Sequence, residues 1–250
     1  MSGGFADHFS ANAASYGRFR PVYPEPLFDH LAALAPRREL AWDCATGSGQ
    51  AVAPLARRFR LVVASDASAA QIAHAQSGDN VRLLVASAER VPLAAASIDL
   101  ITVAQALHWF ALPAFFAEVA RVLRPRGVLA VWTYNLFSIE PRIDALVRAF
   151  YIDTVGPYWP PQRRLVDDAY AGIELPFAET ATTTWTVALR WNLAHLLAYI
   201  ATWSAVAQYR RARGADPMPG LASALAAAWG ESPEREIVWP LTVKTARASA

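Results

Sequence analysis

The chain has 250 residues, a formal net charge of +2 at pH 7 and a single cysteine, Cys44. This length fits one large α/β domain, or one domain with an inserted cap, and is enough to bury a substantial core. One cysteine and five widely spaced histidines exclude a disulfide framework and give no metal-ligand spacing, and the scattered arginines form no basic stripe, so we expect no metal and no nucleic-acid partner.

Strand and helix signals alternate through the first half of the chain. An apolar strand beginning at Leu40 leads into a glycine-rich turn, and four more apolar runs are predicted to be strands, at residues 61–65, 81–85, 98–103 and 128–132. Helical periodicity fills the gaps at residues 26–34, 50–59, 68–76 and 113–123. Strands that alternate with helices predict a parallel sheet covered on both faces.

After Trp132 the alternation stops. The pattern predicts a helix and an aromatic connection, then a strand, a long helix, a second helix and a last strand, at residues 140–175, 180–189, 193–213, 221–229 and 236–244. Two late strands separated by helices suit an antiparallel pair that closes the sheet beneath a helical cap. We predict one domain over residues 1–250, with a core at about 1–135 and, at about 136–250, the cap helices and the last two strands.

The sequence predicts neither a secretory signal nor a membrane-spanning segment. The N-terminus lacks a basic start followed by an apolar stretch, as a secretory signal has. The longest apolar region, at about 98–123, contains Asp99, Pro113 and Glu118, which argues against a membrane span. We therefore expect a cytoplasmic protein without a membrane partner.

The most informative stretch is the turn after the first strand. Gly47 and Gly49 allow a tight turn and a close approach of the backbone to a ligand. A helix predicted from about Gln50 would direct its free N–H groups at an anion, and Asp66, one strand later, can accept hydrogen bonds from both hydroxyls of a ribose. This layout predicts a site for an adenosine-bearing cofactor.

The turn lacks residues that two other kinds of nucleotide-binding motif require, and this narrows the choice of cofactor. A dinucleotide turn would have a third glycine where Val52 stands, and a phosphate-binding P-loop needs a lysine, whereas Lys244 is the only lysine in the chain. A nucleotide-dependent oxidoreductase is therefore a rival interpretation that Val52 argues against. A tight turn with no ligand is the other alternative for this stretch.

The turn resembles the first motif of class I S-adenosylmethionine-dependent methyltransferases, usually Asp-x-Gly-x-Gly-x-Gly, with Ala45 in place of the first glycine. Four further segments match the methyltransferase-11-type branch of that family, in the same order along the chain. They are the lid-like Tyr-Gly-Arg-Phe-Arg-Pro of residues 16–21, Ser-Ala-Glu at 87–89, Ser-Ile-Asp-Leu to His-Trp-Phe at 97–110 and Arg-Val-Leu-Arg-Pro at 121–125. Later segments resemble the same branch, which includes relatives of trans-aconitate methyltransferase.

The resemblance covers about the whole chain and implies a Rossmann-like, seven-stranded, mostly parallel sheet with helices on both faces and a C-terminal helical cap. It also implies S-adenosylmethionine as the cofactor, with Ser87 in place of the carboxylate that grips the adenine edge and Arg20 paired with the methionine carboxylate. For Tyr16 and Arg20 a surface helix packed on the sheet is the alternative. The predicted cofactor-binding residues are Tyr16, Arg20, Asp43, Ala45, Gly47, Gly49, Asp66, Ala67, Ser87, Ala88, Glu89, Gln105 and Ala106.

Methyl transfer from a sulfonium is an in-line displacement that needs mainly correct positioning in a dry site. A carboxylate acceptor is already ionised at neutral pH, whereas an amine, a phenol or an activated carbon acid would benefit from a base, for which His108 is the best-placed candidate. A purely structural histidine is the alternative. Arg142, Arg163 and Arg164 are candidates for holding a carboxylated substrate.

We predict methyl transfer to an oxygen, carboxylate or hydroxyl, of a small molecule. A catalytically inactive cofactor-binding sensor or partner subunit is the rival that Ala45 and Ser87 leave open. The oligomeric state stays open.

Overall fold

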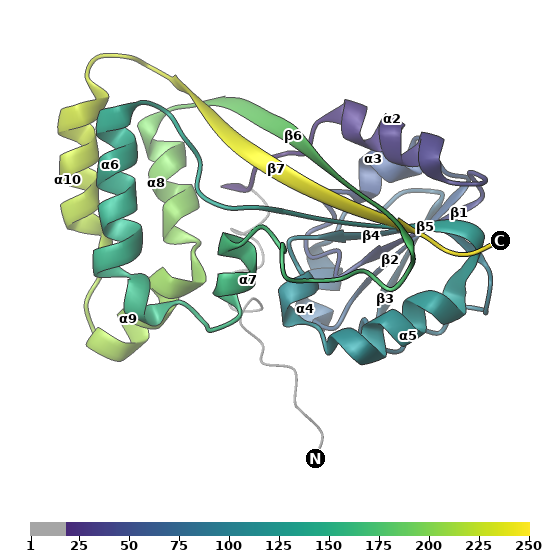
Figure 1. Cartoon of the computed structure of the whole chain (residues 1–250). Coiled ribbons are helices and arrows are strands. Elements are labelled where there is room, and N and C mark those ends of the chain that lie inside the picture. Colours follow the sequence, from purple (N-terminus) through teal and green to yellow (C-terminus); the bar gives the residue numbers. More distant parts are fainter. Residues whose placement is uncertain (1–18) are drawn as a thin grey trace.

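The computed structural model describes residues 19–250 and is built around a seven-stranded sheet in the order β3-β2-β1-β4-β5-β7-β6 (Figure 1). The first five strands are parallel: β1 (Leu40–Cys44), β2 (Leu61–Asp66), β3 (Val81–Val85), β4 (Ile98–Ala104) and β5 (Leu123–Tyr134). The last two, β6 (Glu179–Trp191) and β7 (Arg235–Arg247), are antiparallel, and β7 lies between β5 and β6. The predicted Rossmann-like, mostly parallel sheet is confirmed.

The central strands are apolar because helices cover both of their faces. Successive residues of a strand point to opposite faces, so that Ala41 and Trp132 join one buried cluster and Trp42 and Val131 join the other. The first cluster packs against α2 (Glu25–Leu34) and α3 (Val52–Ala56), the second against α5 (Leu112–Val122), and α4 (Ala69–His74) lies beside β2 and β3.

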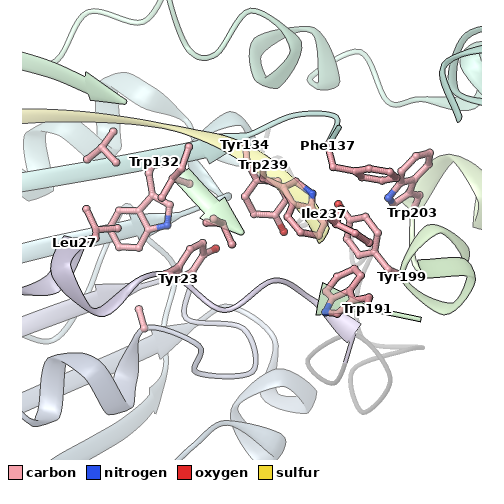
Figure 2. Close-up of a cluster of buried hydrophobic side chains, with 14 of the residues drawn as sticks. Tyr23, Leu27, Trp132, Tyr134, Phe137, Trp191, Tyr199, Trp203, Ile237 and Trp239 are labelled. Atoms are coloured by element: carbon pink, nitrogen blue, oxygen red, sulfur yellow. The ribbon is translucent and has the colours of Figure 1, made fainter. Parts of the chain in front are cut away.

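The second half of the chain adds a group of helices at one end of the sheet (Figure 1). Most of the aromatic residues in this half are core: Trp191 and Tyr199 pack against Trp239, with ring centroids 4.9 and 5.8 Å apart (Figure 2). The helices are α6 (Pro141–Ala149), a π turn at Phe150–Thr154, a 3₁₀ turn at Gly156–Tyr158, α7 (Arg163–Asp167), α8 (Leu193–Ala201), α9 (Ser204–Arg213) and α10 (Met218–Trp229). None of the helices in residues 19–250 is both long enough and apolar enough to cross a membrane.

Two predicted helices differ in the structure. The single helix expected at 193–213 is wrong: α8 ends at Ala201, and Trp203 is extended, with φ −64° and ψ 136°. The Thr202 hydroxyl donates to the Tyr199 carbonyl at 2.6 Å, a local bond that competes with helix continuation. The helix expected at 50–59 shrinks to the five residues of α3, because the glycine turn extends to Ala51. A helix this short does not support the predicted dipole site for an anion.

Candidate functional site

A cavity of about 570 Å³ opens at the carboxyl ends of β1, β2 and β4. Its volume is in the range typical of sites for small molecules. The motifs singled out in the sequence meet there, although they are spread over more than 80 residues of chain. The predicted residues that line it are Arg20, Asp43, Ala45, Gly47, Asp66, Ala67, Ser87, Ala88, Glu89, Gln105 and Ala106. Tyr16 lies outside the described residues.

Asp66 stands at the end of β2 with its carboxylate fixed toward the cavity. The Gly47 N–H donates to Oδ2 at 3.0 Å and the Ser68 N–H donates to Oδ1 at 2.8 Å. These two backbone N–H groups orient the carboxylate, whose oxygens are acceptors only when it is ionised. A pair of vicinal ribose hydroxyls fits such a bidentate acceptor.

Asp43, at the end of β1, is a buried carboxyl group in the wall of the cavity. It is 1% exposed and accepts hydrogen bonds from the hydroxyls of Thr46 at 2.6 Å and Thr102 at 2.7 Å. Burial raises the pKa of Asp43 to about 6, although both hydroxyl bonds lower it. At neutral pH the cavity therefore keeps a buried negative charge, which suits a cationic ligand.

The backbone of the glycine turn is left-handed at three positions, with φ of +54° at Ala45, +55° at Gly47 and +84° at Gly49. Ala45 thus keeps the backbone conformation for which glycine is the usual residue, at a cost of roughly 1–2 kcal/mol. Gly49 does not line the cavity. A Cβ there would lie 2.7 Å from the backbone nitrogen of Gln76, so this glycine allows close packing behind the turn.

Several residues that line the cavity were not among the predicted site residues. Four of them lie within or beside the predicted motifs, so including the neighbouring positions would have identified them: Thr46, Ser48, Gln50 and Ser68. Tyr134 and Gln162 come from β5 and from the loop before α7, and no sequence motif marks them as neighbours of the turn.

A smaller pocket of about 60 Å³ adjoins this cavity and shares Arg20, Gln105, Trp109 and Tyr134 with it. Aromatic rings form much of its wall. Arg20 and Arg163 line it, and no acidic side chain of the described residues does. The other lining residues are His108, Asn135, Leu136, Trp159, Pro160, Tyr199, Trp203 and Ser204.

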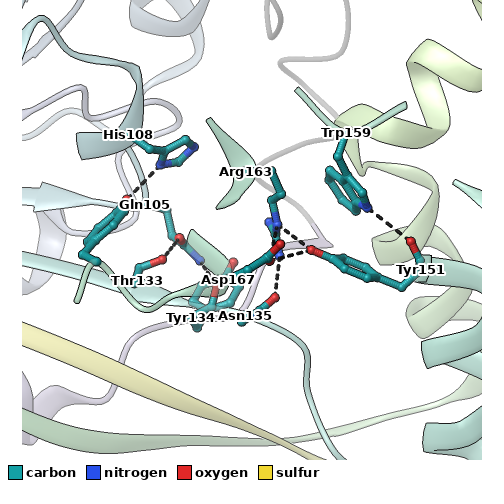
Figure 3. A network of polar contacts seen from close by, with 10 residues as sticks. Gln105, His108, Thr133, Tyr134, Asn135, Tyr151, Trp159, Arg163 and Asp167 are labelled. Atoms are coloured by element: carbon teal, nitrogen blue, oxygen red, sulfur yellow. Dashed lines mark hydrogen bonds and ion pairs between the residues drawn. The ribbon is translucent and has the colours of Figure 1, made fainter. Parts of the chain in front are cut away.

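Arg163 is held firmly at the edge of this pocket (Figure 3). Its Nη2 donates to Asn135 at 2.7 Å, and its Nε donates to the Tyr151 hydroxyl at 2.8 Å and pairs with Asp167 at 3.1 Å. Its guanidinium carbon lies 4.6 Å from the ring centroid of Trp159. These contacts fix the direction of the guanidinium without placing a carboxylate in the pocket itself.

His108 faces the smaller pocket and does not line the main cavity. Its Nδ1 is 2.8 Å from the hydroxyl of Tyr170. Burial and the positive charge of Arg163 lower the pKa of His108 to about 3, so the imidazole is neutral at physiological pH. Tyr170 was not foreseen, because 62 residues separate it from His108 and no motif links them.

Gln105 lines both spaces. Its φ of +54° is left-handed, and its side chain is anchored to β5: Nε2 donates to the Tyr134 carbonyl at 2.8 Å, and Oε1 accepts from Thr133 at 2.7 Å. Its backbone N–H donates to the Trp132 carbonyl at 2.9 Å. Within residues 19–250, no group of three or more His, Cys, Asp or Glu side chains is arranged to hold a metal ion.

Comparison with known proteins agrees with this geometry. Residues 42–131 match a family model described as a methyltransferase domain. A putative methyltransferase of Dictyostelium discoideum is 37% identical over 90% of this chain and 87% of its own. The structure of a putative type II methyltransferase from Anaeromyxobacter dehalogenans superposes with a TM-score of 0.85 at 41% identity, covering 92% of this chain and 99% of its own.

A malonyl-[acyl-carrier protein] O-methyltransferase from a Marinomonas strain is a more distant relative, 32% identical over 53% of this chain and 51% of its own. The cavity also fits the cofactor of these enzymes: it offers a bidentate acceptor for a ribose at Asp66 and a buried negative charge at Asp43 for a cationic group. The chain belongs to the class I S-adenosylmethionine-dependent methyltransferases.

Proposed function

We propose that this methyltransferase transfers the methyl group to a carboxylate oxygen of a small molecule bound in the smaller pocket. The observation that carries the proposal is the guanidinium group of Arg163 in a lining that has no acidic side chain of the described residues. Arg20, which the family resemblance assigns to the methionine carboxylate of the cofactor, lies where the smaller pocket meets the main cavity. A guanidinium group carries the opposite charge to a carboxylate, and its planar N–H donors can bind both carboxylate oxygens at once.

The cofactor supplies a methyl group on a positively charged sulfur. The residues of the pocket have to hold the acceptor oxygen in line with that group and exclude water. Arg163 is fixed by Asn135, Tyr151 and Asp167, so it orients an acceptor without first being ordered itself. Trp159 and Trp203 provide apolar walls around the acceptor.

The state of His108 favours an acceptor that is already ionised. A base is most effective when its pKa lies near the working pH, whereas the pKa of His108 is about 3. A carboxylate needs no base, since its own pKa is near 4. The Marinomonas relative is named as an O-methyltransferase, an enzyme that methylates at oxygen. Ala45 does not favour the inactive sensor, because the backbone there keeps the left-handed conformation that glycine usually adopts.

Labelled S-adenosylmethionine tests this proposal with matched acceptor pairs: benzoate against benzyl alcohol, and phenylacetate against phenylethanol. We expect label in methyl esters of acids and none in ethers. Transfer to the alcohols alone, or to neither member of any pair, would overturn the proposal.

Two variants test the role of the arginine. Arg163→Gln should raise the KM for the acid about 10- to 100-fold, as a lost charged hydrogen bond of about 1.5–3 kcal/mol implies, with unchanged affinity for S-adenosylmethionine. Arg164→Gln is the matched control, because the neighbouring Arg164 is 89% exposed and lines neither pocket. Equal effects of both variants would remove Arg163 from the acceptor site.

A further inference from the structure

The segment after α7 has a strained backbone. Ala169 and Tyr170 are consecutive non-glycine residues in the left-handed region, with φ of +50° and +59°. Each such residue costs roughly 1–2 kcal/mol, and strain of this kind persists only where the surrounding structure enforces it.

Lys244, the only lysine of the chain, enforces this conformation from β7. Its Nζ donates to the backbone carbonyl of Tyr170 at 3.0 Å and to that of Ile173. Burial lowers the pKa of Lys244, so this contact uses a partly desolvated ammonium group to tether a loop. The Tyr170 side chain in this segment is 1% exposed, and its hydroxyl lies 2.8 Å from Nδ1 of His108.

The direction of the bond between Tyr170 and His108 follows from the acid–base character of both groups. Burial raises the pKa of Tyr170, so the phenol keeps its proton, and His108 is neutral. A phenol O–H is a stronger donor than an imidazole N–H, and an imidazole nitrogen is a stronger acceptor than a phenol oxygen. The 2.8 Å contact is therefore an O–H donating to Nδ1.

The neighbours of the phenol agree with this direction. Burial raises the pKa of Tyr170, whereas the nearby backbone N–H groups of Leu107 and His108 lower it by less, which agrees with a phenol oxygen that accepts from the backbone. Thr133 is the other polar side chain within reach, and its alcohol oxygen is a weaker acceptor than the imidazole nitrogen. The phenol proton thus belongs on the bond to His108.

We propose that Tyr170 is a positioning residue for His108: its hydroxyl fixes the tautomer in which Nε2 carries the proton, and that N–H faces the pocket as a donor to the acceptor. The Nδ1 atom of His108 is 2.8 Å from the Tyr170 hydroxyl. In Figure 3, Arg163 lies on the side of the labelled His108 ring away from its dashed hydrogen bond. With Arg20 and Arg163, the Nε2–H group completes a set of donors around the smaller pocket. The statement that the Nε2–H group of His108 binds a carboxylate rests on the proposed function, whereas the statement about the tautomer of His108 does not.

Nitrogen-15 NMR of histidine-labelled protein tests the tautomer directly, with the His108 signals assigned by their loss in His108→Gln. We expect an unprotonated Nδ1 and a protonated Nε2 in the wild type, and a mixture of both tautomers in Tyr170→Phe. Tyr209→Phe is the matched control, because Tyr209 contacts Tyr158 and lines neither pocket. A protonated Nδ1 in the wild type would overturn the proposal. This measurement is made on the wild-type protein, so it does not depend on whether Tyr170→Phe folds.

Kinetics with benzoate supply the second readout. Loss of the fixed donor should raise the KM for benzoate about three- to tenfold in Tyr170→Phe, as expected for one hydrogen bond, with the affinity for S-adenosylmethionine unchanged. If Tyr170→Phe shows the mixture of tautomers but an unchanged KM, the Nε2–H group of His108 does not bind the acceptor. If no acid is methylated at all, the proposed function fails, while the NMR result still decides the role of Tyr170.

Discussion

Replacing Asp43 by asparagine should make the protein more stable at neutral pH and less stable in acid. In the folded protein the pKa of Asp43 is about 6, against an ordinary value of 3.8. Below about pH 3 both the folded and the unfolded chain hold the proton. Between about pH 4 and 6 the unfolded chain ionises while the folded chain still holds its proton, so the free energy of unfolding falls across this window and levels off above it.

The size of this effect follows from the difference between the two pKa values, which is about 2 pH units. Each unit corresponds to about 1.4 kcal/mol, so ionised Asp43 costs the folded state about 3 kcal/mol above pH 7. Asparagine avoids this cost but makes a poorer partner for one of the two threonine hydroxyls, at about 1 kcal/mol. We therefore expect Asp43→Asn to be about 2 kcal/mol more stable at pH 7.5, about 0.5 kcal/mol less stable at pH 4 and about 1 kcal/mol less stable near pH 3.

Urea unfolding of both proteins at several pH values, without cofactor, measures this difference. Asp153→Asn, at an exposed position of the π turn, is the control for the loss of one charge. A stability difference between Asp43→Asn and wild type that stays constant from pH 4 to 7.5 would refute the reasoning. The stabilised variant should also bind S-adenosylmethionine more weakly, because it lacks the buried negative charge.

Three further substitutions test the turn and the end of β2. Asp66→Ala should weaken S-adenosylmethionine binding in calorimetry by about 1–3 kcal/mol, the value of a lost buried polar partner; unchanged affinity would exclude Asp66 from the site. Gly49→Ala should lower the free energy of unfolding by about 1–3 kcal/mol, because its Cβ would lie 2.7 Å from the Gln76 nitrogen, whereas Gly172→Ala, with nothing within 4 Å, should not. Ala45→Gly relieves a left-handed alanine and should not destabilise the protein; a loss above 1 kcal/mol would contradict the strain argument.

The strands and the main cavity were predictable because their signals are local. An apolar run between turn residues is enough to indicate a buried strand, and parallel strands bring their carboxyl ends to one edge. Asp43, Gly47 and Asp66 therefore meet in space as their strand-end positions imply. The two late strands form the antiparallel pair that suits the closing edge of a methyltransferase sheet, as expected from the sequence.

What the sequence did not predict depends on contacts between distant segments. The break at Thr202 and Trp203 comes from one side-chain bond and from the aromatic cluster around Trp203, neither of which changes the helical periodicity. The alignment of Tyr170 with His108 depends on a tether from Lys244, 74 residues further along the chain. Gly49 matched the motif, yet the structure places it behind the cavity wall.

The central claim is that an already ionised acceptor is held by Arg163 and is not deprotonated by His108. The pH dependence of kcat/KM for the acid, at saturating S-adenosylmethionine, tests it most directly. Between pH 6.5 and 8.5 we predict a flat profile, since the carboxylate is ionised, the arginine is charged and the pKa of His108 is about 3 throughout. A profile that rises with pH through this window, and loses that rise in His108→Gln, would contradict the account.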